Sequence, residues 1–236
     1  MIAQSNILKQ IQENLLLQKK SFAVLIDPDK VETGKMTAIL NRLPEETDFI
    51  FVGGSTVENH KTDLVVKAIK ASSNLPIILF HGNVNQISSF ADAILFLSLM
   101  SGDNPEYLIH QQVKSVKHLK RTALEIIPTG YILIDGGKTC TTERVTETKA
   151  IPQTEVEKTV DVALAAQYAG KQLIYLEAGS SARYLVHPRI IKAVKAQVDL
   201  PLIVGGGIRT KDQRKSAYRA GADMVVMGTA FEKYIE

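Results

Sequence analysis

The stretch Leu173-Ile-Tyr-Leu-Glu-Ala-Gly-Ser-Ser-Ala-Arg183 joins a short apolar run to a carboxylate and a flexible turn. An apolar run this short that ends at a glycine is typical of a buried strand rather than a helix. A carboxylate at the end of a buried strand is costly unless it is hydrogen-bonded or used in chemistry. The backbone N–H groups and hydroxyls that follow it suit an anion. The stretch therefore predicts either a substrate site at Glu177 or a satisfied polar residue before an ordinary turn.

Composition excludes several classes of protein. The chain has 236 residues, of which 45% are hydrophobic and 22% are charged, as in a globular protein with one large α/β domain. The net charge is only +3, and the densest basic patch (Lys114, Lys117, Lys120 and Arg121) has no interleaved aromatic residue, so we expect no nucleic-acid partner. The single cysteine, Cys140, excludes internal disulfides and cysteine-based metal clusters. The first residues do not resemble a signal peptide and no apolar run reaches the roughly 20 residues of a membrane span, which predicts a cytoplasmic protein.

Eight short apolar runs alternate with segments of helical spacing. The runs that we interpret as strands cover residues 22–27, 49–52, 75–80, 93–97, 123–134, 173–177, 201–204 and 223–227. Helices are predicted near residues 6–19, 33–43, 64–69, 104–119, 156–164, 188–198 and 210–220, with only a short helical stretch after the third strand. Pro128 indicates a bend or bulge in the fifth run. Residues 135–152 show no periodicity and are predicted to form a long loop.

Alternating strands and helices predict parallel βαβ units with right-handed crossovers. Eight such units in a chain of this length favour a single (β/α)8 TIM barrel over residues 1–236, with an extra N-terminal helix. The alternative is an open, doubly wound sheet. A Gly-x-Gly-x-x-Gly motif at the first helix would favour that sheet, but Asp27-Pro-Asp29 stands there instead.

Polar residues and glycines follow nearly every predicted strand, at the face where barrel enzymes keep their active sites. Gly205-Gly206-Gly207 after the seventh strand and Gly228-Thr229 after the eighth occupy the usual phosphate-binding position of barrels. Glycines let backbone N–H groups approach phosphate oxygens, and the N-terminus of a following helix favours negative charge. The two motifs predict a bound phosphate, and the alternative is a pair of tight turns.

A second anion-binding device follows the first strand. Asp27 and Asp29 flank Pro28, and a carboxylate oxygen suits Mg²⁺, which commonly takes one or two protein carboxylates together with substrate phosphate. Ser55, after the second strand, would supply a second oxygen. Asp-Pro-Asp is also typical of a plain turn. Two such devices on one rim suggest two phosphorylated substrates.

Five motifs, in order, resemble the geranylgeranylglyceryl phosphate synthases and their bacterial relatives. They are Leu25-Ile-Asp-Pro-Asp-Lys30, Val52-Gly-Gly-Ser-Thr56, Tyr175-Leu-Glu-Ala-Gly-Ser180, Val204-Gly-Gly-Gly-Ile-Arg209 and Gly228-Thr229. The similarity extends along nearly the whole chain. It implies a barrel modified near its third helix and a Mg²⁺-dependent prenyltransferase. That enzyme would join sn-glycerol 1-phosphate to a prenyl diphosphate, of twenty carbons in this branch, through an ether bond and release diphosphate.

The resemblance also implies roles for individual residues. Asp27 and Ser55 would hold Mg²⁺ on the diphosphate, and Glu177 would accept the proton of the attacking hydroxyl while Tyr175 helps to place the acceptor. The residues implied to bind glycerol 1-phosphate are Tyr175, Leu176, Glu177, Ala178, Gly179, Ser180, Ser181, Gly205, Gly206, Gly207, Gly228 and Thr229. Ser181 stands where the family usually has glycine, and His81 where it usually has proline.

Further properties follow from the same resemblance. The prenyl tail would lie in an apolar groove along the barrel, and the chain would form a homo-oligomer (a dimer or a hexamer). Apart from the resemblance, release of a lipid product leads us to expect transient contact with a membrane. Two other functions remain open. A barrel enzyme acting on a phosphosugar would share the glycine turns but would not need Asp-Pro-Asp. A non-catalytic barrel that binds a phosphorylated metabolite would not need a base such as Glu177.

Overall fold

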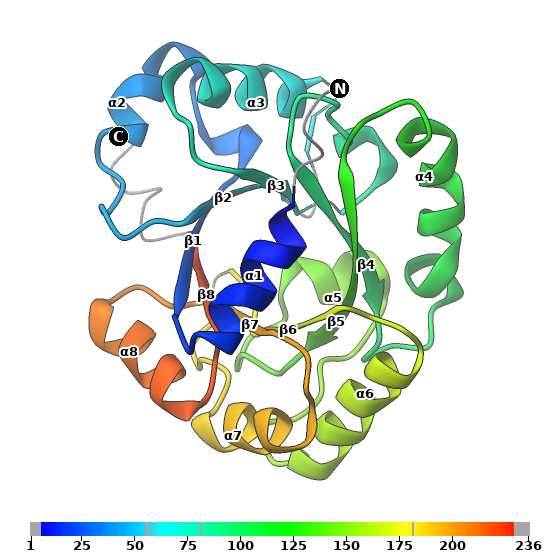
Figure 1. Ribbon diagram of the computed structural model, residues 1–236. Coiled ribbons are helices and arrows are strands. Elements are labelled where there is room, and N and C mark those ends of the chain that lie inside the picture. The colour runs from blue at the N-terminus through cyan, green and yellow to red at the C-terminus, as the bar shows by residue number, and fades with distance from the viewer. Residues whose placement is uncertain (1–5, 55–56, 59, 81, 181, 229–236) are drawn as a thin grey trace.

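Eight parallel strands close into a barrel in the order of the sequence (Figure 1). The computed structural model describes residues 6–228 except for 55–56, 59, 81 and 181. The strands are β1 Ser21–Ile26, β2 Phe49–Val52, β3 Ile77–Leu79, β4 Ala93–Leu99, β5 Glu125–Leu133, β6 Leu173–Glu177, β7 Leu202–Gly205 and β8 Met224–Met227. Parallel pairing of β1 with β8 closes the ring, with Phe22 opposite Val225. The predicted (β/α)8 barrel is confirmed, and the open sheet is excluded.

Helices surround the ring of strands, except between β3 and β4, where no α-helix is present among the described residues. The α-helices are α1 Ile7–Leu16, α2 Met36–Leu40, α3 Lys61–Ser72, α4 Gln111–Leu119, α5 Thr141–Thr146, α6 Val156–Tyr168, α7 Pro188–Gln197 and α8 Lys211–Ala220. Shorter segments are η1 Pro28–Lys30, η2 Thr33–Lys35, η3 Val84–Gln86 and the π-helical η4 Glu106–His110. Between β3 and β4, η3 is the only helical segment among the described residues, which confirms the modification near the third helix. Among the described residues, no helix is long and apolar enough to cross a membrane.

The structure corrects two predictions of local structure. Residues 135–152 are not a plain loop, because they contain α5, which begins with a capping box between Cys140 and Glu143. The fifth strand has no bulge, because β5 pairs with β4 in unbroken register through Pro128. The carbonyl of Pro128 accepts the N–H of Gln172, just before β6 begins. The N–H and C=O of one strand residue point to the same side of the strand. The N–H that Pro128 lacks would therefore point toward the residues before β6, where there is no strand for it to pair with.

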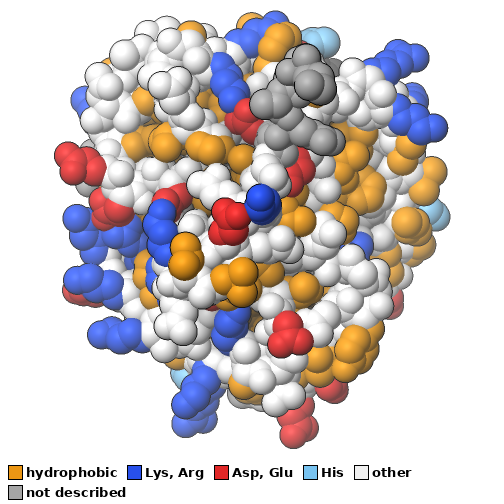
Figure 2. Space-filling model, in the orientation of Figure 1, with side chains coloured by type: hydrophobic (Ala, Val, Ile, Leu, Met, Phe, Trp, Pro, Cys, Tyr) orange, Lys and Arg blue, Asp and Glu red, His pale blue; other side chains and the backbone are white. Residues whose placement is uncertain are grey.

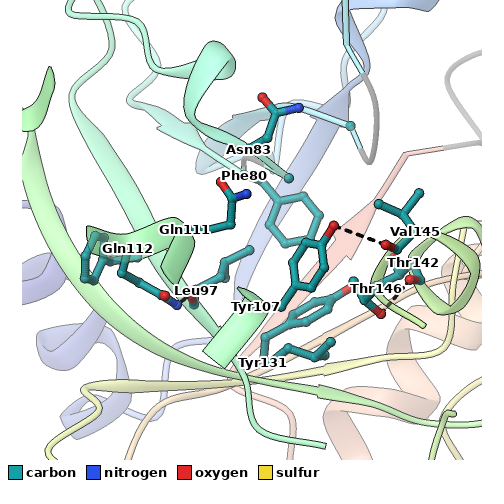
Figure 3. A pocket seen from close by; sticks show the side chains of 14 residues that line it. Phe80, Asn83, Leu97, Tyr107, Gln111, Gln112, Tyr131, Thr142, Val145 and Thr146 are labelled. Carbon is teal, nitrogen blue, oxygen red and sulfur yellow. Dashed lines mark hydrogen bonds between the residues drawn. The ribbon is translucent and has the colours of Figure 1, made fainter. Parts of the chain in front are cut away.

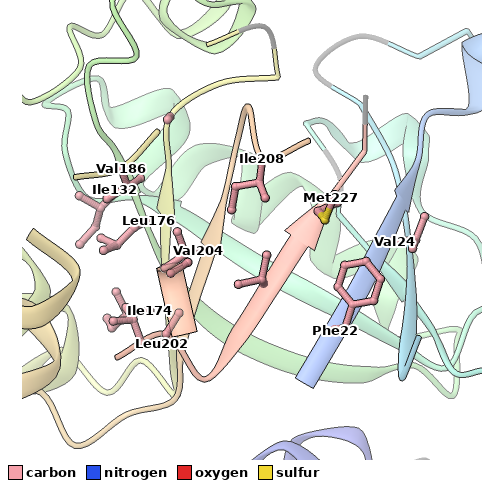
Figure 4. Close-up of a cluster of buried hydrophobic side chains, with 14 of the residues drawn as sticks. Phe22, Val24, Ile132, Ile174, Leu176, Val186, Leu202, Val204, Ile208 and Met227 are labelled. Atoms are coloured by element: carbon pink, nitrogen blue, oxygen red, sulfur yellow. The ribbon is translucent and has the colours of Figure 1, made fainter. Parts of the chain in front are cut away.

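Alternation along the strands divides the core into two layers. One layer fills the inside of the barrel and includes Phe51, Ile78 and Tyr175. The other lies between the strands and the outer helices, and Figure 4 shows part of it around Leu176 and Val204 of β6 and β7. The strand that carries Tyr175 and Glu177 therefore points those two side chains into the barrel and directs Leu176 toward the helices.

The helix α1 covers the N-terminal opening of the barrel (Figure 1). Ile7 and Ile11 pack into the interior layer. The carboxylate of Glu125, at the start of β5, accepts the backbone N–H groups of Ile7 at 2.6 Å and Leu8 at 3.0 Å. A negative charge at a helix N-terminus satisfies donors that lack a partner within the helix. This contact fixes the extra helix predicted from the sequence.

Three aspartates at the N-terminal end of the barrel make the same set of contacts. Asp48, Asp92 and Asp223 each stand directly before a strand and accept a backbone N–H of a neighbouring strand. Each also has a lysine partner, the contacts being Lys19 to Asp48, Lys70 to Asp92, and Lys20 and Lys195 to Asp223. These carboxylates link adjacent strands, which is a structural task.

Candidate active site

A cavity of about 330 Å³ lies at the C-terminal ends of the strands. It brings together most of the predicted site residues, namely Asp27, Tyr175, Glu177, Gly179, Ser180, Gly206, Gly207 and Gly228. Leu176, Ala178 and Gly205 do not line it. The predicted residues Ser55, Ser181 and Thr229, together with His81, lie outside the described residues. The predicted carboxylates and glycine turns thus face one space.

The three predicted residues that do not line the cavity support its wall. Leu176 and Ala178 belong to the core layer beneath the helices, and the N–H of Ala178 donates to the carbonyl of Gly205 at 3.1 Å. A Cβ added to Gly205 would lie 2.3 Å from the hydroxyl oxygen of Tyr175. Gly205 is therefore required because the Tyr175 hydroxyl occupies the place of a side chain.

Glu177 is buried at the end of β6, with 7% of its surface exposed. Its Oε1 accepts the backbone N–H of Gly179 at 2.6 Å, and the Tyr175 hydroxyl donates to the carboxylate. No described lysine or arginine forms an ion pair with it. Burial raises the pKa of Glu177 to about 7, although the bonds from Gly179 and Tyr175 act in the opposite direction. A carboxylate with a pKa near neutrality can both accept and release a proton.

Glycines next to Glu177 present free backbone donors. Among the described residues, the N–H groups of Gly206, Gly207 and Gly228 have no acceptor. These three glycines line the cavity, and unpaired backbone N–H groups beside a cavity suit an anion. Gly206 has a φ of +88°, and a Cβ there would lie 2.3 Å from Oε1 of Glu177. A side chain at this position would displace the carboxylate.

The second carboxylate, Asp27, reaches the same cavity from the end of β1. Its Oδ1 accepts the N–H of Asp29 at 3.1 Å, and its Oδ2 lies 3.5 Å from Nζ of Lys30. Burial raises the pKa of Asp27, although the Asp29 N–H and Lys30 lower it. The described chain contains no group of three or more metal-ligating side chains. One carboxylate is nevertheless sufficient for Mg²⁺ when substrate phosphate and water supply the remaining oxygens, so Asp27 fits that ion.

An aromatic wall borders the cavity, and the sequence analysis missed two of its three members. The rings of Phe80 and Tyr175 stack with centroids 5.2 Å apart, and the Tyr131 ring lies 5.9 Å and 5.5 Å from them. Tyr131 also forms a side-chain hydrogen bond with Thr142 of α5. Aromatic residues near the carboxyl ends of the third and fifth apolar runs were the available signal. Only the closed barrel brings them next to Tyr175.

Beyond this wall lies a smaller, mainly apolar cavity of about 90 Å³ (Figure 3). It shares Gly54, Phe80, Tyr131 and Thr142 with the larger cavity, so the two are adjacent. Its other walls come from β4, η4, α4 and the unpredicted helix α5. The Tyr107 hydroxyl donates to the carbonyl of Val145 at 3.1 Å and ties η4 to α5 across the cavity.

The fold and the site define a (β/α)8 barrel in which a buried carboxylate with a raised pKa and glycines with unpaired backbone N–H groups line one cavity. The chain belongs to the PcrB family, whose model matches residues 14–236. A geranylgeranylglyceryl phosphate synthase of Zunongwangia profunda is 52% identical over 92% of each chain. The protein of the same name from Thermococcus kodakarensis is 46% identical over 94% of this chain and 88% of its own.

A solved structure agrees with these sequence relatives. The (S)-3-O-geranylgeranylglyceryl phosphate synthase of Thermoplasma acidophilum, in complex with its substrate sn-glycerol-1-phosphate, superposes with a TM-score of 0.88. It is 37% identical to this chain, and the match covers 96% of this chain and 92% of that one. The family resemblance in the sequence is therefore confirmed.

Proposed function

We propose that this protein forms an ether bond between sn-glycerol 1-phosphate and geranylgeranyl diphosphate and releases diphosphate. Family relatives named for this synthase, at 52% and 46% identity, support the proposal. The structural observation that carries it is the buried carboxylate of Glu177 beside unpaired backbone N–H groups, in a cavity that adjoins an apolar one. A phosphorylated, hydroxyl-bearing acceptor and a donor with a hydrocarbon tail match these three features.

The acceptor phosphate would bind the free N–H groups of Gly206, Gly207 and Gly228. The N–H of Gly179 is already bonded to Glu177, so we assign it to orienting the carboxylate rather than to the phosphate. The bound glycerol 1-phosphate of the Thermoplasma acidophilum relative supports an acceptor of this kind. Donors fixed in advance hold an anion with little reorganisation.

The donor tail would extend past the aromatic wall into the apolar cavity. This arrangement leaves the allylic carbon near Phe80 and Tyr131, whose ring faces favour developing positive charge. The acceptor hydroxyl oxygen forms a bond to that carbon while the bond between the carbon and the diphosphate oxygen breaks. The hydroxyl proton passes to the carboxylate of Glu177, and the bonding pair leaves with diphosphate.

Asp27 would hold Mg²⁺, with Ser55 as the second protein ligand expected from the family motif. When bound, the ion neutralises negative charge on the leaving diphosphate. The metal role can be tested with Asp27→Asn against Asp135→Asn as a matched control. Asp135 forms the same local turn, with its Oδ1 accepting the N–H of Gly137, but it does not line the cavity. Unchanged activity of Asp27→Asn in saturating Mg²⁺ would refute the metal role.

The reaction itself is tested by incubating the purified protein with labelled sn-glycerol 1-phosphate, geranylgeranyl diphosphate and Mg²⁺. We expect labelled product in the organic extract, and none when sn-glycerol 3-phosphate replaces the acceptor. Shorter and longer prenyl diphosphates in parallel reactions would define the preferred length. Tight binding of glycerol 1-phosphate without product would instead indicate a sensor, and turnover of a phosphosugar without a prenyl donor would indicate an enzyme of that class.

A further inference from the structure

The outer face of α4 and η4 carries an exposed apolar stripe. Ile109, Val113 and Val116 have 52%, 63% and 39% of their surfaces exposed. Their spacing places them on one side of the helix, whereas Gln112, Ser115 and Leu119 are buried against the barrel. No other described residue covers the stripe. Exposed apolar side chains grouped in this way mark a surface for interaction.

Positive charge is concentrated beside the stripe. Residues 111–121 hold four of the 28 basic residues and none of the 25 acidic ones, leaving 24 basic against 25 acidic residues in the rest of the chain. Lys114 pairs with Glu106. Lys117, Lys120 and Arg121 are exposed and have no ion pair within the described chain. Figure 2 shows basic and histidine side chains beside apolar ones at the edge of the molecule that α4 forms.

The same helical segment is a wall of the apolar cavity. Tyr107, Gln111 and Gln112 line that cavity, while the stripe occupies the opposite side of η4 and α4. The product of the proposed reaction carries a long hydrocarbon chain, and its transfer into water is strongly unfavourable. A bilayer against the outer face would receive such a product a short distance from where it forms.

We propose that the stripe of Ile109, Val113 and Val116, together with Lys117, Lys120 and Arg121, is a docking surface for an anionic lipid bilayer. Amphipathic helices with apolar and basic groups bind such surfaces through both kinds of contact. A second copy of this chain fits less well, because a symmetric contact would bring together two copies of residues 111–121, which hold four basic residues and no acidic one. The purpose of the docking rests on the proposed function, but the binding itself does not.

The test measures flotation of the substrate-free protein with vesicles of phosphatidylglycerol and phosphatidylcholine, and with phosphatidylcholine alone. We expect binding to the anionic vesicles that decreases as salt is added. Val113→Asp should lower it at least tenfold, and removing the charge of Lys117 with Lys117→Gln should lower it about fivefold. The matched controls are Leu64→Asp on α3, which is 57% exposed, and Lys215→Gln on α8, and both should bind like the wild type.

Two results would overturn the proposal. One is an absence of binding to anionic vesicles at low salt, or equal binding by all variants. The other is light scattering that shows Val113→Asp breaking an oligomer of a protein that does not bind vesicles, because the stripe would then be an interface between copies. Product formation is measured separately without vesicles. Product without vesicle binding removes only the docking proposal, and vesicle binding without product removes only the proposed reaction.

Discussion

The carboxylates at the two ends of the barrel have contrasting surroundings. At the N-terminal end, Asp48, Asp92 and Asp223 each have a backbone N–H and at least one lysine. At the C-terminal end, Glu177 is buried and pairs with no lysine or arginine of the described chain, and burial raises its pKa to about 7. Asp27 at the same end also has a raised pKa. The comparison teaches that acids paired with lysines hold the strands together. The acids whose burial outweighs their hydrogen bonds and charged neighbours face the cavity and are available for chemistry.

Glu177→Gln should produce the largest effect, and the effects on activity and stability should have opposite signs. Loss of the proton acceptor should lower kcat by a factor of about 10² to 10⁴. The folded protein holds the Glu177 proton more strongly than the unfolded chain, whose ordinary value is 4.5. The free energy of unfolding of the wild type therefore falls as pH rises from 4.5 through about 7.

The glutamine variant lacks this titration. It should gain up to about 3 kcal/mol over the wild type above pH 7, with the gain vanishing below pH 4.5. Denaturant unfolding at several pH values measures the difference. A variant that is destabilised equally at every pH would show that Glu177 is an ordinary paired acid like those at the other end.

Asp223→Ala tests the opposite end. It removes the partner of Lys20, Lys195 and the N–H of Leu202, so we expect a loss of about 2–4 kcal/mol in the free energy of unfolding. The kcat of the folded variant should not change, because Asp223 lies at the end of the barrel away from the cavity. Urea unfolding and initial rates at low temperature measure the two properties. A large fall in kcat with an unchanged free energy of unfolding would contradict the structural role that we assign to Asp223.

Gly206→Ala and Gly170→Ala separate backbone strain from disturbance of the site. Both glycines have positive φ, +88° and +80°, so backbone strain alone should cost about 1 kcal/mol of stability when alanine replaces either one. At position 206 an added Cβ would lie 2.3 Å from Oε1 of Glu177 and 2.5 Å and 2.7 Å from the backbone nitrogens of Gly179 and Ala178, which adds a further stability cost, whereas at position 170 it would meet nothing within 4 Å. We therefore expect kcat/KM to fall more than tenfold only for Gly206→Ala. Equal rates for the two variants would show that crowding of Glu177 and of the backbone that follows it is unimportant for the reaction.

Glu125→Gln should give the smallest change. The loss of the charge at the N-terminus of α1 should lower stability by about 1 kcal/mol and leave activity as it is. Hydrogen exchange at the backbone N–H groups of Ile7 and Leu8 would report the loosened end of the helix. Unchanged exchange there would mean that packing of α1, rather than this carboxylate, holds its first turn.

Sequence patterns were sufficient for the barrel because each strand is a short apolar run that ends at a glycine or a polar residue. The capped helix α8 was also predictable, since Thr210 and Gln213 form its capping box. The helix α5 was not, because six threonine-rich residues are too few to show a period. The predicted helix at 33–43 is divided between η2 and the short α2, and neither segment has a side-chain N-cap bond.

The candidate site, like the fold, could be predicted only in part from the sequence. The residues that follow β1, β6, β7 and β8 were identifiable because parallel strands bring their carboxyl ends to one rim. The raised pKa of Glu177 could not be predicted from the sequence, because the burial that causes it depends on the closed barrel around this residue. Nor could the sequence indicate that Gly205 makes room for the Tyr175 hydroxyl, or that Phe80 and Tyr131 separate two cavities. These facts depend on distances between elements far apart in the chain.

The most direct test of the account is the titration of the Glu177 side chain itself. Carbon-13 NMR of glutamate-labelled protein would follow its carboxyl resonance, assigned by its absence from Glu177→Gln. The account predicts half-titration near pH 7, because the carboxylate is buried and no described lysine or arginine pairs with it. Half-titration near pH 4.5 would contradict it, since Glu177 would then be as well compensated as the acids that hold the other end of the barrel.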